Sequence, residues 1–208
     1  MYNLKAQGFI DHNTISFFIK SNSATGSIIK FGSYDLTGIM NGQTLQVYET
    51  VDRTRWAING NNILANDHVV TLNEREFSFN MHLPYIYIPS DDFKNFAVAM
   101  AQFQLDIKCS DTLNYCKLDY PCSQATFDPW RLKFNLYDSR VSTNYQIPFT
   151  PKYMIDGASF KDPNTCYFPI FKSMNGVQDT WYIGNLFINY FYLVFDMSPL
   201  DEFGKDYI

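Results

Sequence analysis

The stretch from Trp181 to Asp196 reads WYIGNLFINYFYLVFD and carries the most specific fold signal in the chain. Its two ends, Trp181–Ile183 and Phe191–Phe195, are rich in the aromatic and β-branched residues that favour strands. Gly184 lies between them, where the missing side chain permits a close backbone approach. The residues from Gly184 to Tyr190 predict the start of a short helix. Because a closing strand of a β domain is apolar on both faces, the aromatic residues here predict core packing rather than a ligand site.

Similar short runs recur outside this stretch, separated by Gly, Pro, Asn and Asp, and they predict a mainly β protein. Asp91–Gln104 (DDFKNFAVAMAQFQ) instead spaces its apolar residues near a helical period, which predicts one amphipathic helix with Ser90 as N-cap. Met1–Ile10, with Gly8 near its end, predicts a second short helix. We find no repeat or composition break, so residues 1–208 are expected to form a single domain. The remaining predicted strands are Ile15–Ile19, Ser27–Phe31, Thr44–Tyr48, Trp56–Ile58, His68–Leu72 and Arg131–Leu136.

The composition excludes several classes of protein. Hydrophobic residues make up 46% of the 208 residues and aromatic residues 18%, far above what a disordered chain contains. The formal net charge of -5 and the pI near 5.1 argue against nucleic acid or anionic membrane as a partner, because both require clustered Lys and Arg. No stretch approaches the roughly 18 apolar residues of a membrane span. The pattern also predicts no cofactor and no metal site.

The four cysteines are even in number and allow two interpretations. Zinc would require Cys-x-x-Cys pairs or a nearby His, and no His follows His82. Disulfides are therefore favoured, although the spacing leaves three pairings open. They indicate an oxidising compartment, so we expect a protein of the secretory pathway, the lysosome or vacuole, or the extracellular space. Because Met1–Ile10 lacks the apolar core of a signal peptide, we expect the signal upstream of this sequence. The cysteines are Cys109, Cys116, Cys122 and Cys166.

Five stretches, in the same order, resemble the second half of pepsin-like aspartic peptidases. The family is bilobal, each lobe supplying one catalytic Asp, and the resemblance covers essentially the whole chain as the carboxy-terminal lobe. The first lobe is absent from this sequence, and no Asp-Thr-Gly or Asp-Ser-Gly occurs in it. The resemblance implies a disulfide between Cys122 and Cys166, which leaves Cys109 with Cys116. The five stretches are Asn3–Lys20, Thr25–Asp35, Phe77–Phe93, the Cys122 and Cys166 pair, and Trp181–Asp196.

The second catalytic motif of the family is replaced in this chain. Aspartic peptidases need two carboxylates that share a proton, one acting as base and one as acid. An asparagine in place of the second Asp keeps its shape but cannot ionise. Placing Tyr85–Pro89 on the strand that follows the family motif puts Asn80 at the Asp, Met81 at the Thr, His82 at the Gly, and Leu83 and Pro84 at the Thr-Ser pair.

Two interpretations of this turn remain. Either Asn80 and His82 form a rebuilt site with His82 as a base, or the site has decayed; we favour decay, because a lone His without an orienting carboxylate is a weak signal. The acidic pairs Asp91–Asp92 and Asp201–Glu202 read as a helix start and a solvated turn. We therefore predict a family member without catalytic activity that binds a polypeptide substrate or ligand if a cleft forms with a first lobe. The alternative is a binding or structural protein that retains only the fold.

Overall fold

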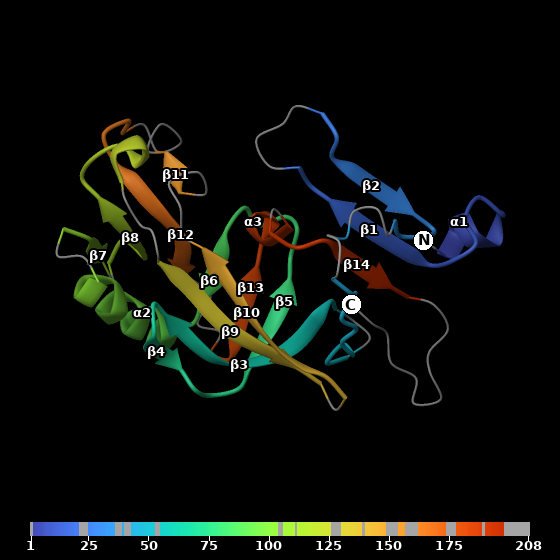
Figure 1. Cartoon of the computed structure of the whole chain (residues 1–208), viewed down its shortest axis with the longest axis horizontal. Helices are drawn as coiled ribbons and strands as arrows, with labels where there is room; N and C mark the ends of the chain where they lie inside the picture. The colour runs from blue at the N-terminus through green and yellow to red at the C-terminus, as the bar shows by residue number, and fades with distance from the viewer. Residues whose placement is uncertain are drawn as a thin grey trace.

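A computed structural model of the chain describes residues 2–20, 25–35, 39, 43–52, 55–103, 106–110, 112–125, 130–138, 140–148, 154–156, 162–173, 178–188 and 190–197. Within these residues the strands form two sheets of unequal size, accompanied by short helices. Figure 1 shows the smaller sheet beside one end of the larger one. The fold is therefore mainly β, as predicted.

The smaller sheet joins the two ends of the described chain. It has the order β14-β1-β2 and is antiparallel throughout. Thr14 lies opposite Asp196, and its hydroxyl donates a hydrogen bond to the Asp196 carboxylate at 3.0 Å. Helix α1 precedes the sheet and ends near Gly8, whose φ of 72° is a conformation that glycine adopts easily. The elements are α1 (Tyr2–Ala6), β1 (Thr14–Phe18), β2 (Ile28–Phe31) and β14 (Leu193–Asp196).

In the larger sheet, the turn at residues 80–84 follows one central strand and precedes another. The strand order of this sheet is β10-β9-β3-β5-β13-β6-β12-β8-β7, with β4 paired to β3 and β11 paired to β12. The bounds are β3 (Ala57–Ala65), β4 (His68–Thr71), β5 (Arg75–Phe79), β6 (Ile86–Ile88), β7 (Lys108–Ser110), β8 (Tyr115–Leu118), β9 (Arg131–Tyr137), β10 (Ser142–Pro148), β11 (Ile155–Asp156), β12 (Cys166–Lys172) and β13 (Thr180–Ile183).

The core lies on one face of the larger sheet, beneath helix α2 (Ser90–Phe103). Alternate residues of the central strands are completely or almost completely buried there, because successive strand side chains point to opposite faces. Phe93, Phe96 and Met100 repeat at helical spacing and are fully buried in the same core. The buried residues on this face are Phe77 and Phe79 of β5, Trp181 and Ile183 of β13, and Ile86 and Ile88 of β6.

Strand β13 occupies a central position in the large sheet. It runs parallel to β5 on one side and antiparallel to β6 on the other. The predicted neighbourhood of Tyr85–Pro89 and Trp181–Ile183 is confirmed, because Tyr182 pairs with Tyr87 and Ile183 with Ile86. Helix α3 (Asn185–Ile188) follows β13, where the sequence predicted a helix start.

Two local predictions are wrong. Residues 44–48 form no strand; the structure has only an isolated bridge at Glu49, although β-branched and aromatic residues are present. Strand propensity alone does not create a strand without a partner to pair with. Ser90 is the first helical residue rather than the N-cap, because the Pro89 carbonyl accepts the first helical bond, from the Phe93 N–H at 2.8 Å.

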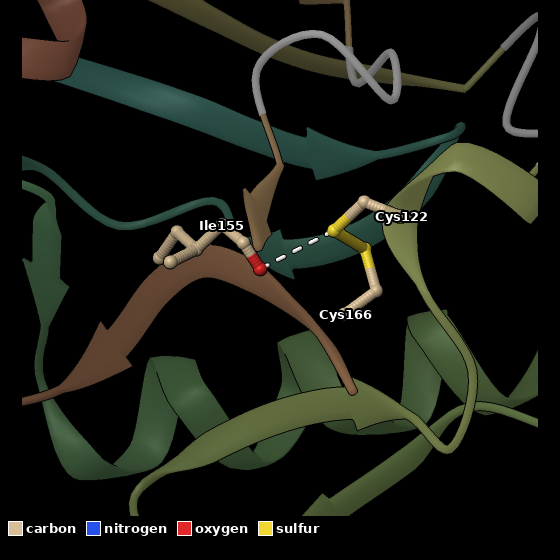
Figure 2. Close-up of a disulfide and its surroundings, with 3 residues drawn as sticks. All are labelled: Cys122, Ile155 and Cys166. Atoms are coloured by element: carbon tan, nitrogen blue, oxygen red, sulfur yellow. Dashed lines mark hydrogen bonds between the residues drawn. A yellow bond between two sulfur atoms is a disulfide. The ribbon is translucent and has the colours of Figure 1, made fainter. Parts of the chain in front are cut away.

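Both disulfides link residues that the fold brings together. Cys109 and Cys116 lie directly opposite each other on β7 and β8, with Cα atoms 3.9 Å apart. The second bridge connects Cys122, in a short 3-10 helix (Cys122–Gln124), to Cys166 at the start of β12, with Cα atoms 4.7 Å apart. The Cys122 sulfur lies 3.2 Å from the Ile155 carbonyl oxygen, a contact that Figure 2 marks with a dashed line. This contact is not a hydrogen bond, because a disulfide sulfur carries no proton.

Candidate functional site

The turn at residues 80–84 begins where β5 ends. The Asn80 N–H donates to the Ile183 carbonyl at 2.9 Å, which ties the start of the turn to β13. The Asn80 side-chain oxygen accepts a hydrogen bond from the His82 N–H at 3.1 Å, and its backbone oxygen accepts one from the Leu83 N–H at 3.1 Å. Asn and Asp commonly organise turns in this way, by bonding their own backbone two residues on. Asn80 therefore shapes the turn through its oxygen, which an aspartate could also do.

Gly184 lies directly beneath this turn. A Cβ atom at Gly184 would lie 2.3 Å from the Leu83 carbonyl oxygen and 2.4 Å from that of Tyr85. Both are backbone atoms, so a side chain at this position would force the turn away from the strand. The first N–H groups of α3 complete the contact, since Asn185 donates to Leu83 at 2.8 Å and Leu186 donates to Pro84 at 3.2 Å. The close approach predicted for Gly184 is thus what holds the turn against β13.

The side chains of the turn supply little chemistry. Asn80 is a neutral amide, and Met81 packs partly buried against the main core. His82 is exposed, and in the part of the chain that the structure describes its side chain has no hydrogen bond or ion pair with a carboxylate. Leu83 and Pro84 carry no hydroxyl. A catalytic histidine needs an orienting group, so the geometry offers no support for His82 as a base.

No group of His, Cys, Asp and Glu side chains suited to holding a metal occurs among the described residues. The described helices also include none that is both long and apolar enough to cross a membrane. The acidic pair Asp201–Glu202, read from the sequence as a solvated turn, lies outside the described residues.

A buried ion pair supports the strand beneath the turn. The Arg75 guanidinium donates to both oxygens of Asp92, at 2.8 and 2.9 Å, and the Trp181 ring N–H donates to Asp92 at 2.8 Å. Arg75 is 9% exposed and Asp92 1%. The hydrogen bond to Asp92 raises the pKa of Arg75 above its ordinary value, despite the opposing effect of burial. The network therefore joins β5, β13 and the first turn of α2 through three side chains.

Sequence reasoning found only part of this network. Asp91 and Asp92 were interpreted as a helix start, and both do lie in the first turn of α2. The buried role of Asp92 was missed, because Arg75 and Trp181 become its neighbours only when the sheet forms. The available signal was weak: a charged residue inside the apolar run around Phe77, with a Trp that needs a partner for its ring N–H.

Comparison with known proteins gives the family. A family model described as eukaryotic aspartyl protease matches residues 1–201. The chain belongs to this family. A search of curated proteins finds no match.

The fold of this aspartyl protease family member resembles that of a solved structure. The crystal structure of Basic 7S globulin from soybean matches with a TM-score of 0.71 and 13% sequence identity. The match covers 99% of this chain and 52% of the globulin chain, so this chain spans about half the length of that protein. At this identity the likeness shows the fold alone, and it agrees with one lobe of a pepsin-like fold.

Proposed function

We propose that this chain is the second lobe of a bilobal aspartic protease fold and that it binds a polypeptide without hydrolysing it. The observation that carries the proposal is Asn80, an amide at the end of β5 where the family motif supplies a carboxylate. A single remaining carboxylate from another lobe could not form the pair that shares a proton. The structural neighbour is consistent with this proposal, since that protein is named a globulin.

The turn retains its backbone function while its chemistry is lost. Gly184 and the bonds from Asn80, Asn185 and Leu186 still hold the segment in place. Replacements at Met81, His82, Leu83 and Pro84 remove the flexible glycine and the hydroxyl groups that would support a catalytic pair. A scaffold kept without its acid is the arrangement expected of a protein that binds rather than cleaves.

Hydrolysis at acid pH tests the catalytic half of this proposal. We expect neither the chain nor its Asn80→Asp variant to release fluorescence from a quenched acid-protease peptide. Losing an essential acid or base costs about 10²- to 10⁴-fold in rate, and the altered turn would still misplace a restored carboxylate. Turnover by the unmodified chain that a statine-type transition-state mimic inhibits would overturn the proposal.

The outer edge of the smaller sheet supports the lobe assignment. Ile28, Ile29 and Phe31 of β2 are each about half exposed, at 50, 53 and 52%. On its outer side β2 has no strand partner among the described residues. Exposed apolar edge strands favour association with another chain or domain. We propose that a first lobe covers this edge.

Association in solution tests the lobe assignment. We expect the isolated chain to self-associate and to bind an apolar dye, and we expect Ile29→Lys to reduce both effects, because a charge on an edge strand opposes pairing. Val98→Lys is the matched control, since Val98 is 57% exposed on α2 and lies far from the edge in the sequence. A monodisperse monomer that binds no dye would identify a self-sufficient domain.

The two disulfides support a location outside the reducing cytosol. Disulfides persist in oxidising compartments and are rare in the cytosol. We therefore propose that the protein is located in the secretory pathway, the lysosome or vacuole, or the extracellular space. Alkylation of free thiols in protein extracted without reductant tests this, and modification of Cys122 or Cys166 would contradict it.

A further inference from the structure

The hairpin formed by β7 and β8 lies at one edge of the large sheet. Figure 1 shows it at the opposite end of that sheet from the smaller sheet. Strand β8 pairs with β12 on its inner side, and on its outer side β7 has no strand partner among the described residues. Cys109 of β7 and Cys116 of β8 lie directly opposite each other, so their disulfide joins two neighbouring antiparallel strands. A change in this disulfide would act first on an edge hairpin.

The Cys109–Cys116 bridge holds the two strands closer together than strand pairing does. Its Cα atoms are 3.9 Å apart, whereas directly opposite residues of antiparallel strands are normally about 4.5 or about 5.5 Å apart. Disulfides usually join Cα atoms that are about 4.4–6.8 Å apart, and a bridge outside this range is easier to reduce. The Cys122–Cys166 bridge, with Cα atoms 4.7 Å apart, lies within the range. Reduction of the first bridge would let β7 and β8 relax toward the usual strand spacing.

The two bridges also differ in their access to solvent. Cys109 is partly exposed and packs against the main core, whereas Cys116 is completely buried in it. Cys122 and Cys166 are 7% and 0% exposed, so both ends of their bridge lie inside the core. A thiolate in solution must reach one sulfur atom of a disulfide to displace the other. The first bridge therefore offers a route of attack, at Cys109, that burial closes at the second.

The charge beside the Cys109–Cys116 bridge favours an attacking thiolate. A lysine adjoins each cysteine in the hairpin, and Lys108 and Lys117 lie directly opposite each other. Both pair with Asp119, so two ammonium groups share one carboxylate and leave that group with one net positive charge. Successive strand residues point to opposite faces, so this charge acts on the bridge through space rather than by contact. It attracts an anionic nucleophile and stabilises the thiolate that leaves.

Burial of Cys116 acts in the opposite direction. A thiolate in an apolar core is poorly solvated, so Cys116 leaves more slowly than an exposed cysteine would. The same penalty applies to both cysteines of the second bridge, where the residues adjoining Cys122 and Cys166 in the sequence are uncharged. Burial therefore slows exchange at both bridges and leaves the difference between them in place.

We propose that the Cys109–Cys116 disulfide is a site of thiol–disulfide exchange, which a dithiol reductant opens while the Cys122–Cys166 bridge stays intact; this inference does not depend on the proposed function. One thiolate of the dithiol attacks the Sγ atom of Cys109. The S–S bond breaks, and Cys116 leaves as a thiolate and takes up a proton. The second thiol of the dithiol then displaces Cys109 from the mixed disulfide. Two electrons and two protons thus pass from the dithiol to the protein, and the dithiol becomes a disulfide.

Opening of the bridge should loosen the hairpin without unfolding the rest of the chain. Strand β7 is short and pairs with β8 only along Lys108–Ser110, and an isolated hairpin of this kind is marginally stable. Strand β8 remains paired on its other side with β12, which begins at Cys166 of the second bridge. The reduced and oxidised forms should therefore differ at this edge of the large sheet and agree elsewhere.

Timed alkylation of the folded full chain tests the proposal. The chain is incubated with dithiothreitol, free thiols are blocked with N-ethylmaleimide at increasing times, and mass spectrometry of the digest measures the label on each cysteine. We expect Cys109 and Cys116 to be labelled about tenfold faster than Cys122 and Cys166, because their bridge is both less relaxed and more accessible. Intrinsic tryptophan fluorescence should stay native while the first bridge opens. In concentrated urea the preference should disappear, because it arises from the folded structure.

A charge variant separates exchange at this site from general loosening of the fold. Lys108→Gln removes the net positive charge beside the bridge and should slow its opening about twofold, whereas Lys108→Arg should retain the rate. Lys133→Gln is the matched control: Lys133 also pairs with an aspartate, Asp67, but lies on β9 near the other end of the large sheet. It should leave the rate of opening unchanged.

The proposal is overturned if the two bridges open at equal rates in the folded chain, if Cys122–Cys166 opens first, or if Cys109–Cys116 opens only together with loss of the native fluorescence. Amide hydrogen exchange gives a second test that needs no reductant. In the double variant Cys109→Ala with Cys116→Ala, we expect faster exchange in β7 and β8 and unchanged exchange in β6 and β13. Unchanged exchange in the hairpin would show that the bridge does not control this edge.

Discussion

The turn at residues 80–84 and the segment Gly184–Ile188 touch each other but differ in how closely they resemble the family. If Asn80 takes the place of the family's second Asp, as we propose, the turn differs from the family motif at every position from Asn80 to Pro84. The segment beneath it has Gly184 and the backbone bonds that hold the turn, with Asn185 donating to Leu83 at 2.8 Å. The hydrogen bonds from Asn185 and Leu186 that join the two are made by backbone atoms.

This difference shows that the shape of the site and its chemistry depend on different atoms. The shape depends on Gly184, on the pairing of β13 with β5 and β6, and on the ion pair of Arg75 with Asp92. In the proposed function, the chemistry depends on the side chain at one position, Asn80. An aspartate there can accept the same bond from the His82 N–H, so this change should leave the fold intact, whereas changes in the supporting residues should not.

Asp92→Ala is expected to cause the largest loss of stability. Asp92→Ala leaves the Arg75 guanidinium and the Trp181 ring N–H buried without their acceptor, and breaking a buried pair in this way costs about 3–5 kcal/mol in the free energy of unfolding. Urea unfolding measures the loss. Asp91→Ala is the control: Asp91 is 86% exposed and pairs only at the surface with Lys94, so we expect less than about 1 kcal/mol. Equal losses of stability in the two variants would show that the buried ion pair does not stabilise the fold.

The two disulfides should differ in how much they stabilise the folded chain. Cys122 and Cys166 are 44 residues apart and Cys109 and Cys116 only 7, and a longer loop constrains the unfolded chain more. In the entropic model the long bridge stabilises by about 4 kcal/mol and the short one by about 2.5 kcal/mol. Paired Cys→Ala variants compared by thermal unfolding test this order. A larger loss from the short bridge would contradict the entropic account.

Gly184→Ala should cause the next largest loss of stability. It disturbs the contact between Gly184 and the turn at residues 80–84 directly. The new Cβ would meet two backbone carbonyl oxygens within 2.4 Å, so the turn must move, at a cost of about 3 kcal/mol. Gly8→Ala is the matched control, because Gly8 has open space around it and only its φ of 72° opposes alanine, by about 1–2 kcal/mol. A Gly184→Ala variant as stable as Gly8→Ala would show that the turn is not held by this approach.

Asn80→Asp should have the smallest effect on stability. The aspartate oxygen can accept the same bond from the His82 N–H, and the site is partly exposed, so we expect a change below about 0.5 kcal/mol. We also expect the structure of the turn to be unchanged, which the chemical shifts of His82 and Leu83 would report. A large loss of stability here would mean that the amide is required by the fold and not merely tolerated.

Much of the fold could be predicted from local sequence. The spacing of Phe93, Phe96 and Met100 predicted α2, and Gly184 was correctly interpreted as a point of close approach. The strand predicted at residues 44–48 failed because local propensity does not provide a pairing partner. The decay of the site and the absence of catalysis stay predictions, since they depend on the second half of a cleft.

The sequence by itself determined the family and the mainly β class, because both follow from local composition and short motifs. The replacement of the motif acid by Asn80 stays a proposal that rests on the resemblance to the family. The tertiary structure alone decided which distant residues meet. Arg75, Asp92 and Trp181 form one network only after β5 and β13 are ordered in the sheet. In the same way, Phe171 pairs with Tyr87 and Tyr115 only after β12 lies between β6 and β8. Strand order is set by burial and hydrogen bonding between segments far apart in the chain, and no short window of sequence contains both partners.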